Sequence, residues 1–429
     1  MKAFTEPLLS LAGFEEMTKT AEKSSGLISV TGCIDAQKSQ MIYAFGGHRK
    51  NKLIVTFGEQ KAKELYDEYS FFDKEVVYYP SKDVLFYQSD IRGNLLTAER
   101  IRALKAIHEQ ERVTLVTTFD ALMNTMAPIE KMWENVLTLE QRQLLDLKEI
   151  QAALIRMGYE KEYQVQTMGQ FSVRGGILDV FPLTEENPIR IELWGDEIDT
   201  IRYFDCESQK SIENTDRVSI YPAAELVLSD EEKARGIEKL KAEAKRVSDK
   251  LRKQMKTEEA HRVSVMADEL TEEWGELSMY AGMDAFLSYF FDERVGLLDY
   301  FNPSDSLIFF DELTRCAEQG KLTETEFSES MKQRLAMGYI LPGQMNGLFT
   351  EKEIVAKLEK YSCIALGALD NKANGLHQLG SYGIHCQSVS PYNNSFELLI
   401  KDLKRYKKNG YRVILLSGSR TRAKRLSED

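Results

Sequence analysis

A glycine, a lysine and a serine near the N-terminus have the spacing of a phosphate-binding loop. Gly32, Lys38 and Ser39 fit the pattern GxxxxGK followed by Ser or Thr, but Gln37 stands where the second glycine belongs. In a working loop that glycine lets backbone N–H groups wrap a phosphate, and the lysine meets the β- and γ-phosphates. Gln37 brings a Cβ to this position, and Asp35 adds a negative charge that opposes anion binding. We therefore expect no ATP hydrolysis at this loop.

An acidic pair farther along the chain supports the same interpretation. Asp311 and Glu312 follow four apolar residues, 307–310, in the form of the strand-end acidic residues that hold Mg²⁺ in ATPases. A buried strand that ends in acidic residues is common, so this pair alone would favour a structural role. The damaged loop also follows the first expected strand and opens a helix, as the motif requires. Together the two features predict a decayed RecA-like domain without catalytic residues or a bound cofactor.

Two arginines and a tryptophan are candidates for binding a partner. In residues 188–195, PIRIELWG, Arg190 and Trp194 share one face of an expected strand, and three aliphatic residues take the other face. Arg174 lies in the turn VRGGIL that precedes this strand. Arginine and tryptophan are enriched at binding hot spots. The pattern leaves a second interpretation open, in which Trp194 packs locally and both arginines pair with nearby carboxylates: Glu185, Glu186, Asp196 and Glu197.

The elements that carry these residues predict an α/β fold. Short β-branched runs at 27–31, 52–57, 76–79 and 114–118 alternate with helical patterns, which indicates a doubly wound parallel sheet. After a helix expected over 141–159, strands follow one another with turn glycines between them, which predicts an antiparallel insertion. The strand 306–313 is expected to resume the first sheet, so that the RecA-like domain is discontinuous.

We expect four segments along the chain. Residues 1–128 form the first part of the degenerate RecA-like domain, and 129–218 form the inserted, β-rich α+β domain. Residues 219–385 return to the RecA-like domain and include a charged, solvated amphipathic helix over about 229–261. Residues 386–429 begin a small α/β domain with a helix at 395–410 and a strand at 411–419. The basic helix that starts at 420 stops after two turns, which suggests that the natural chain continues.

The composition argues against membrane-spanning, exported and zinc-binding proteins. The 429 residues are 43% apolar and 29% charged, with a formal charge of −12, and they contain no long apolar run or export signal. The five cysteines lack C-x-x-C spacing, which fits a reducing cytoplasm and argues against a zinc site. We expect a cytoplasmic protein without membrane contact. The negative charge disfavours DNA binding through the basic stretches 47–52 and 419–425, although that hypothesis stays open.

Four longer motifs resemble a known family. GQFSVRGGILDVFP at 169–182 and IRIELWGDEIDTIRYFD at 189–205 resemble the insert shared by bacterial transcription-repair coupling factors and the excision-repair protein UvrB. LLDYFNPSDSLIFFDEL at 297–313 resembles the acidic strand of both, and GMDAFLSYFFDERVGLLDYF at 282–301 looks like the coupling-factor version. The damaged loop favours the coupling factor over UvrB. So does the stretch 80–107, which leaves no room for the aromatic hairpin of UvrB.

The resemblance implies a function. It identifies the chain as the N-terminal, UvrB-homologous region of a bacterial coupling factor, a non-catalytic adaptor whose insert docks on UvrA. The family's contact residues fall on Arg174, Arg190 and Trp194, the last often a phenylalanine in the family. The full-length protein would also bind RNA polymerase and double-stranded DNA and would move along DNA with an ATP-driven motor absent from these residues. Its C-terminal part would cover the docking face at rest. The alternative is a UvrB-like ATPase or helicase fragment that retains nucleotide or DNA binding.

Overall fold

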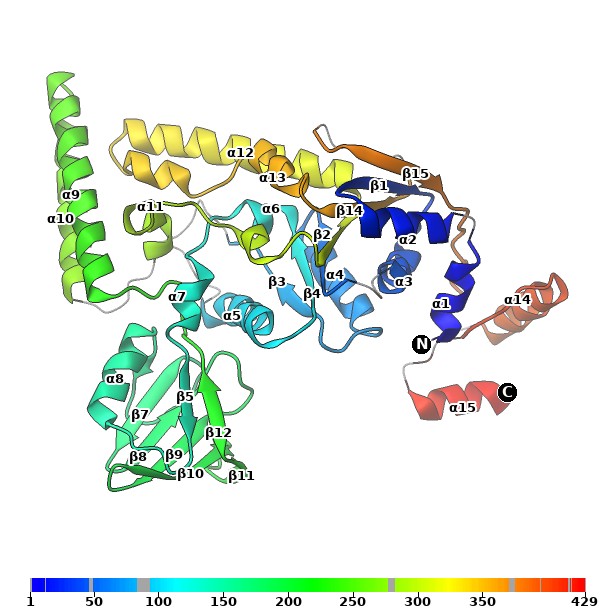
Figure 1. Ribbon diagram of the computed structural model, residues 1–429, viewed down its shortest axis with the longest axis horizontal. Helices are drawn as coiled ribbons and strands as arrows, with labels where there is room; N and C mark the ends of the chain where they lie inside the picture. The colour runs from blue at the N-terminus through cyan, green and yellow to red at the C-terminus, as the bar shows by residue number, and fades with distance from the viewer. Residues whose placement is uncertain are drawn as a thin grey trace. The chain divides into compact units, whose positions relative to one another are not determined.

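The computed structural model describes residues 2–11, 13–45, 49–82, 93–276, 282–369, 375–393, 395–415, 417 and 419–428 (Figure 1). The chain divides into two compact units, Met1–His385 and Cys386–Asp429, and each is described by itself. In the described ranges, no helix is both long enough and apolar enough to cross a bilayer.

The first unit is built on a seven-stranded sheet in which every neighbouring pair is parallel. The strand order is β15-β1-β14-β13-β2-β4-β3. The bounds are β1 Gly26–Thr31, β2 Asn51–Thr56, β3 Val77–Tyr79, β4 Val113–Thr118, β13 Ser306–Asp311, β14 Ser362–Gly367 and β15 Gln378–Gly383. This confirms the predicted parallel sheet and its discontinuity, since strands from both sides of the insertion pair with each other. β14 and β15 were not predicted.

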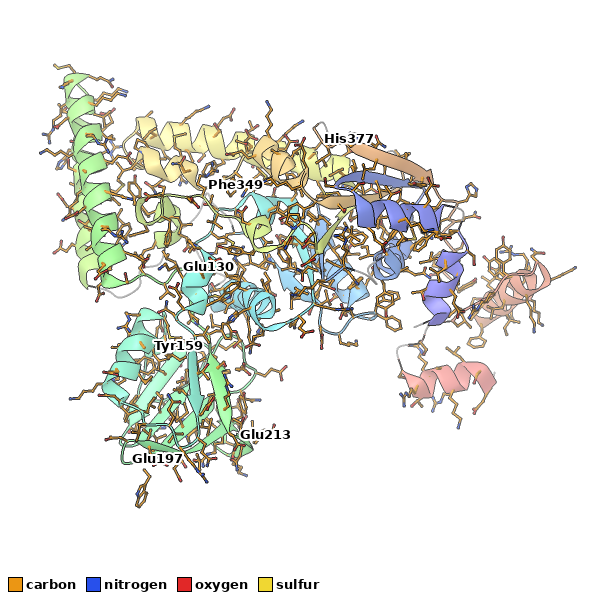
Figure 2. All side chains as sticks on the ribbon, in the orientation of Figure 1. Glu130, Tyr159, Glu197, Glu213, Phe349 and His377 are labelled. Atoms are coloured by element: carbon orange, nitrogen blue, oxygen red, sulfur yellow. The ribbon has the colours of Figure 1, made fainter. Side chains whose placement is uncertain are left out.

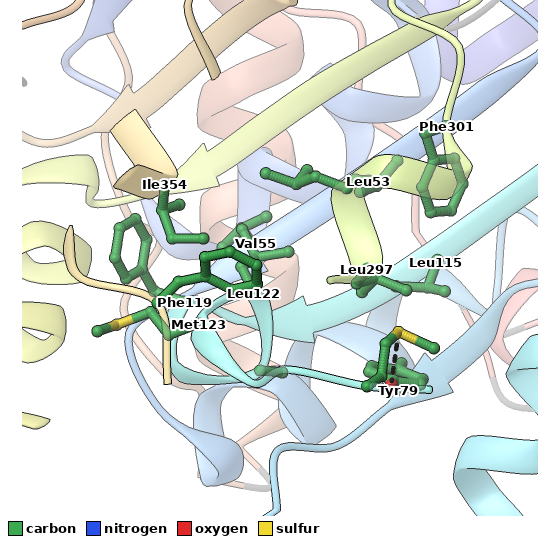
Figure 3. Packing of buried hydrophobic residues seen from close by; sticks show 14 of the residues in the cluster. Leu53, Val55, Tyr79, Leu115, Phe119, Leu122, Met123, Leu297, Phe301 and Ile354 are labelled. Carbon is green, nitrogen blue, oxygen red and sulfur yellow. Dashed lines mark hydrogen bonds between the residues drawn. The ribbon is translucent and has the colours of Figure 1, made fainter. Parts of the chain in front are cut away.

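Apolar residues of the sheet alternate between two cores. In β13, Leu307 and Phe309 belong to one buried cluster, while Ile308 and Phe310 belong to the other. The first cluster also contains residues of α2 Phe14–Lys23, α3 Asp35–Phe45 and α4 Glu59–Tyr69; the second contains residues of α5 Gly93–Glu109, α6 Phe119–Met123, α12 Leu313–Ala336 and α13 Glu351–Leu358. Figure 3 shows part of the second core, where Phe119 and Leu122 lie beside Val55. A parallel sheet covered on both faces needs this two-sided apolar pattern.

The insertion forms its own sheet. Its order is β11-β10-β9-β8-β7-β6, with β12 paired to β5 beside it, and only the short β6–β7 pair is parallel among the described strands of the insertion. The elements are α7 Ile129–Trp133, β5 Leu137–Glu140, α8 Leu147–Arg156, β6 Glu160–Lys161, β7 Gln170–Arg174, β8 Ile177–Val180, β9 Ile189–Trp194, β10 Glu197–Phe204, β11 Ser211–Thr215 and β12 Arg217–Ile220. The inserted antiparallel α+β domain is thereby confirmed.

The charged segment after the insertion contains the predicted amphipathic helix but does not form it as one piece. It folds as two helices, α9 Asp230–Lys253 and α10 Thr257–Glu276, joined at Met255 with φ of 61°. Leu240 and Ala244 of α9 pack with Val263 of α10 and with Trp274, in one buried cluster. The charged sides of α9 are exposed as predicted, but a single helix over 229–261 is wrong, because the chain turns at 254–256 and a thin stripe of small and apolar residues packs the two helices together.

The remaining elements of the first unit are short. The aromatic-rich stretch after α10 forms three short helical elements, η1 Met283–Phe286, α11 Leu287–Phe290 and η2 Leu297–Tyr300. α1 Lys2–Leu9 and η3 Pro342–Asn346 complete the described elements.

The second unit contains α14 Phe396–Lys408 and α15 Arg420–Glu428. The strand expected over 411–419 is not formed at 411–415 or 417. A strand needs a neighbour to take its backbone hydrogen bonds, and no second strand occurs in the described residues of this unit. The division into four segments stays a prediction.

Candidate functional site

The damaged phosphate loop connects β1 to α3, as the motif requires. Gly32 has φ of 83°, and a Cβ at this position would lie 2.1 Å from the carbonyl oxygen of Ile384. Ile384 also donates its N–H to the carbonyl oxygen of Thr31 at 2.9 Å. Glycine is therefore required here by the close approach of the chain's own backbone.

Lys38 is buried at the start of α3, among three carboxylates. Its Nζ donates to Asp311 Oδ1 at 2.5 Å, Asp35 Oδ1 at 2.8 Å and Glu312 Oε1 at 3.1 Å. Asp311 ends β13, and Glu312 follows it with φ of 58°. An ammonium group has three N–H donors, so these contacts engage all of them. The structure thus brings together the lysine and the acidic pair that the sequence singled out.

The charges of this cluster stabilise one another. Burial alone would lower the pKa of Lys38, but the charge and hydrogen bond of Asp311, helped by Asp35 and Glu312, raise it above its ordinary value. The hydrogen bond from Lys38 lowers the pKa of Asp35 against the opposing effect of burial. Lys61 adds a contact of 3.1 Å to Asp35. The site therefore presents a neutralised lysine ringed by carboxylates, which disfavours a phosphate.

Two other residues of the loop, Gln37 and Ser39, are also in positions that do not suit phosphate binding. Ser39 donates its hydroxyl to Glu68 Oε2 at 3.3 Å. Within the described part of the chain, Gln37 Oε1 is buried and accepts no hydrogen bond, in the position that the pattern reserves for glycine.

The inserted sheet carries the three residues expected to bind a partner. In β9, Ile189 and Ile191 are buried, while Arg190 faces the other side. The pairing of Ile177 with Glu192 brings the turn 175–176 and the turn 195–196 to the same end of the sheet. Glu197, the partner of Trp194 in the ladder, lies at the end of the insertion far from Tyr159 (Figure 2).

Asp179 of β8 holds both arginines. Arg190 donates through Nε to Asp179 Oδ1 at 2.7 Å and through Nη2 to Oδ2 at 2.8 Å, and it also reaches Gln209 Oε1 at 2.8 Å. Arg174 donates to the same Oδ2 at 3.0 Å. The hydrogen bond to Asp179 raises the pKa of Arg190 despite burial. Both arginines are therefore paired, but with a carboxylate that the sequence analysis did not name.

The three predicted residues differ in exposure. Trp194 is 85% exposed, which excludes the local packing that the sequence left open. The Arg174 side chain is 36% exposed, whereas that of Arg190 is only 12% exposed and lies over the Phe204 ring at 4.3 Å. Tyr163, which sequence reasoning missed, is 83% exposed and has its ring 5.9 Å from the Arg174 guanidinium. We call Arg174, Asp179, Arg190, Trp194 and Tyr163 the arginine face.

Asp179 could have been found from its pattern. It interrupts the aliphatic strand at 177–180 and is the only acidic residue of that strand. A buried aspartate in a strand needs donors, and strands with arginines flank this one on both sides.

Two other features from the sequence fall partly outside the described residues. The stretch 80–107, read as lacking an aromatic hairpin, includes 83–92, and the basic stretch 47–52 includes 47 and 48. The second basic stretch, 419–425, begins α15.

The comparisons with known proteins agree with this architecture. Residues 137–226 match the family model described as the UvrB interaction domain. The chain is similar to transcription-repair-coupling factors of Bacillus subtilis strain 168, with 26% identity covering 87% of the chain and 31% of that protein, and of Staphylococcus haemolyticus, with 25% identity covering 93% and 34%. A third relative, from Staphylococcus aureus strain MRSA252, is 25% identical over 96% of the chain and 35% of its own length.

The chain spans about a third of the length of the curated relatives it matches. The insertion that carries the arginine face lies inside the matched range, and the similarity to the coupling factors extends over the degenerate RecA-like unit as well. Residues 137–226 are thus similar to the UvrB interaction domain, and the chain as a whole is similar to the transcription-repair-coupling factors.

Proposed function

We propose that this chain is a non-catalytic adaptor that binds UvrA through the arginine face. It would thereby recruit nucleotide excision repair to RNA polymerase stalled at DNA lesions. The observation that carries the proposal is the pairing of Arg174 and Arg190 on one buried carboxylate beside an exposed tryptophan, within a UvrB interaction domain.

The face has the chemistry of a protein-binding hot spot. Asp179 holds the two guanidinium groups in fixed positions, so little side-chain entropy is lost when a partner carboxylate meets them. The side chain of Arg174 is partly exposed to solvent, so its guanidinium group can donate more than one hydrogen bond to a partner carboxylate. Trp194 exposes a rigid, flat, apolar ring system at the same end of the sheet. Tryptophan and arginine are among the residues most enriched at hot spots of protein interfaces.

The alternative of a nucleotide-hydrolysing fragment finds less support. A phosphate at the loop would need Lys38 to leave three carboxylates, Gln37 replaces the second glycine of the pattern, and the Ile384 backbone packs closely against Gly32. We therefore propose that this chain uses no cofactor. For the whole protein we propose contacts with RNA polymerase and double-stranded DNA and a cytoplasmic location, by analogy with the coupling factors.

Calorimetric titration of the chain with UvrA from the same organism tests the proposal. The double variant Arg174→Ala/Trp194→Ala removes the two exposed side chains and should weaken binding by about 30-fold or more, the usual loss at a hot spot. A matched control, Arg217→Ala/Met255→Ala, removes an exposed arginine and an exposed apolar side chain elsewhere and should bind like wild type.

Equal losses in the two variants, or no binding by wild type, would contradict the adaptor function. Nucleotide titration of the same wild-type sample separates the alternatives. Saturable Mg-ATP binding that Lys38→Ala abolishes would favour the ATPase fragment instead.

A further inference from the structure

The end of the α9–α10 hairpin is strongly basic in an acidic protein. Residues 239–256 contain eight lysines and arginines and two acidic residues, whereas the whole chain carries a formal charge of −12. Figure 1 shows α9 and α10 side by side in green. The basic residues gather on the second half of α9 and on the turn that follows it. We call this segment the basic hairpin end.

Packing explains why these charges face solvent. Leu240, Ala244, Ser248 and Leu251 recur at helical spacing and are buried against α10 and its neighbours. The remaining sides of the helix are left to the charged residues. All eight basic residues are exposed: Lys239, Lys241, Lys245, Arg246, Lys250, Arg252, Lys253 and Lys256.

Asp249 within this segment and Glu258 just after it are exposed acidic residues, and Glu259 is partly exposed, but few described carboxylates form ion pairs with the eight basic side chains. Lys239 pairs with Asp292 at 2.8 Å. Glu243 turns inward, where it accepts hydrogen bonds from the Tyr289 hydroxyl and, at 3.1 Å, from the Gly343 N–H. No described carboxylate forms an ion pair with the other seven basic side chains of this segment. The helix dipole favours cations in the last turn of α9, but it does not account for Lys241, Lys245 and Arg246, which precede that turn.

The length and the lysine content of this basic segment fit the phosphate backbone of a DNA duplex better than a protein surface. From Lys239 to Lys253 the helix rises about 21 Å, a length over which a DNA duplex presents about 12 phosphate charges. Protein interfaces are depleted in lysine and need an apolar centre. Here lysines dominate, and Met255 is the large apolar side chain exposed at this end of the described hairpin. Lysine suits phosphate contacts that carry no sequence information.

We propose that the basic hairpin end binds the phosphate backbone of double-stranded DNA without sequence preference. The site is distinct from the arginine face and from the basic stretches 47–52 and 419–425. Its place at the tip of two packed helices makes it a projecting contact, with affinity that depends strongly on salt because binding releases counterions.

Anisotropy of a fluorescent mixed-sequence duplex of about 30 bp, titrated with the whole chain from about 50 to 200 mM KCl, tests the proposal. Wild type should bind with a linear, negative dependence of log K on log salt. Lys245→Gln/Arg246→Gln/Lys250→Gln/Lys253→Gln should weaken binding by about 10-fold or more at low salt and reduce the slope by about 3 to 4. Thermal unfolding should change only slightly, because the four positions are exposed and only Lys250 and Lys253 interact with the dipole at the end of α9.

A control with the same change in net charge separates a local site from a general charge effect. Arg420→Gln/Arg422→Gln/Lys424→Gln/Arg425→Gln removes four charges from α15 and should retain most of the affinity and the slope. Equal losses in both variants, or no wild-type binding at low salt, would overturn the proposal.

If the first hairpin variant unfolds, Lys241→Gln/Lys245→Gln/Arg252→Gln/Lys256→Gln replaces it, with the same expectation. UvrA titrated against the hairpin variant should bind as it does to wild type. A failure of the DNA site would therefore leave the adaptor function untouched, and a failure of UvrA binding would leave the DNA site untouched.

Discussion

Asp179 and Arg190 face each other across the β8–β9 ladder, and the carboxylate of one accepts two hydrogen bonds from the guanidinium of the other, at 2.7 and 2.8 Å. The same carboxylate accepts a third bond from Arg174. Asp179 is itself buried and Arg190 is mostly covered, so of these three side chains a partner reaches chiefly Arg174 and not the carboxylate that orients it. The binding residues and the positioning residue therefore have separable roles.

The first prediction concerns that positioning residue. Asp179→Asn keeps the shape of the side chain but removes the charge that two arginines share. We expect a loss of about 1–3 kcal/mol in the free energy of unfolding, because Arg190 keeps a mostly covered charge with only neutral acceptors. Urea unfolding followed by circular dichroism measures this loss. Affinity for UvrA should fall by about 10-fold, although Asp179 would not touch the partner.

Glu192→Gln is the control for this change. It removes the ion pair with Arg202 on the same side of the sheet, where both side chains are partly exposed. A pair of this kind contributes at most about 1 kcal/mol. If Glu192→Gln matched Asp179→Asn in both stability and affinity, the special role of Asp179 would be wrong.

The second prediction concerns the loop lysine. Lys38→Met preserves the length of the side chain but leaves Asp35, Asp311 and Glu312 without their common cation. We expect a destabilisation of about 2–4 kcal/mol near neutral pH, because Lys38 and Asp311 are both buried. Chemical unfolding of the variant beside Ser39→Ala, which loses one long hydrogen bond, measures the difference.

The pH dependence of that difference follows from the sign of the shift at Asp35. Lys38 lowers the pKa of this carboxyl in the folded state, so the stabilisation is present above the unfolded pKa and is lost as the pH falls through the folded pKa. Burial raises the pKa of Asp311 even beside Lys38, so the gap between wild type and Lys38→Met should begin to narrow above the ordinary aspartate pKa of about 4 and narrow further below it. A gap that stays constant with pH would mean that packing, not charge, explains the loss.

The sequence anticipates this cluster because of a general property of parallel sheets. The loop after β1 and the acidic pair after β13 both follow the carboxyl ends of strands, which meet at one edge of the sheet. The sequence alone does not show that Lys38 binds the acidic pair itself. Only the packed structure reveals this contact and the close approach of the Ile384 backbone to Gly32.

The missed elements have physical reasons as well. β14, SCIALG, is short and rich in small residues, and β15, QLGSYG, lacks apolar alternation, so neither carries a strand pattern of its own. Both strands form because they pair with β1, β14 along one side of it and β15 along the other. Asp179, by contrast, carries a pattern of its own as the single acidic residue of an aliphatic strand, but its arginine partners lie on the neighbouring strands.

The third prediction concerns a buried charge cluster at the exit of the insertion. Glu225 accepts hydrogen bonds from Arg100 at 2.7 and 3.0 Å and pairs with Lys82 at 2.9 Å. Although burial opposes ionisation, Arg100 and Lys82 lower the pKa of Glu225 to about 2. A carboxyl with a depressed folded pKa stabilises the fold above its unfolded pKa, and this contribution is lost as the pH falls towards 2.

Glu225→Gln tests that linkage. The variant should lose roughly 3 kcal/mol of stability at neutral pH, and the deficit should shrink as the pH falls from about 4.5 to 2. Unfolding midpoints in urea across this pH range measure the effect. Glu109→Gln, which removes a single acceptor of the Tyr221 hydroxyl, is the control and should show a much smaller and flatter deficit.

The last prediction separates binding from folding at Trp194. Its side chain is almost fully exposed, so Trp194→Ala should change the free energy of unfolding by less than about 0.5 kcal/mol. The same change should weaken UvrA binding by about 30-fold, because a hot-spot aromatic is removed. Trp194→Phe keeps a flat apolar ring and should lose less than about 5-fold, a loss of under about 1 kcal/mol. Calorimetric titration of both variants with UvrA decides whether the apolar ring or the indole N–H of Trp194 makes the contact. If Trp194→Phe binds UvrA as poorly as Trp194→Ala, Trp194 acts through a hydrogen bond from its indole N–H and not through its apolar surface.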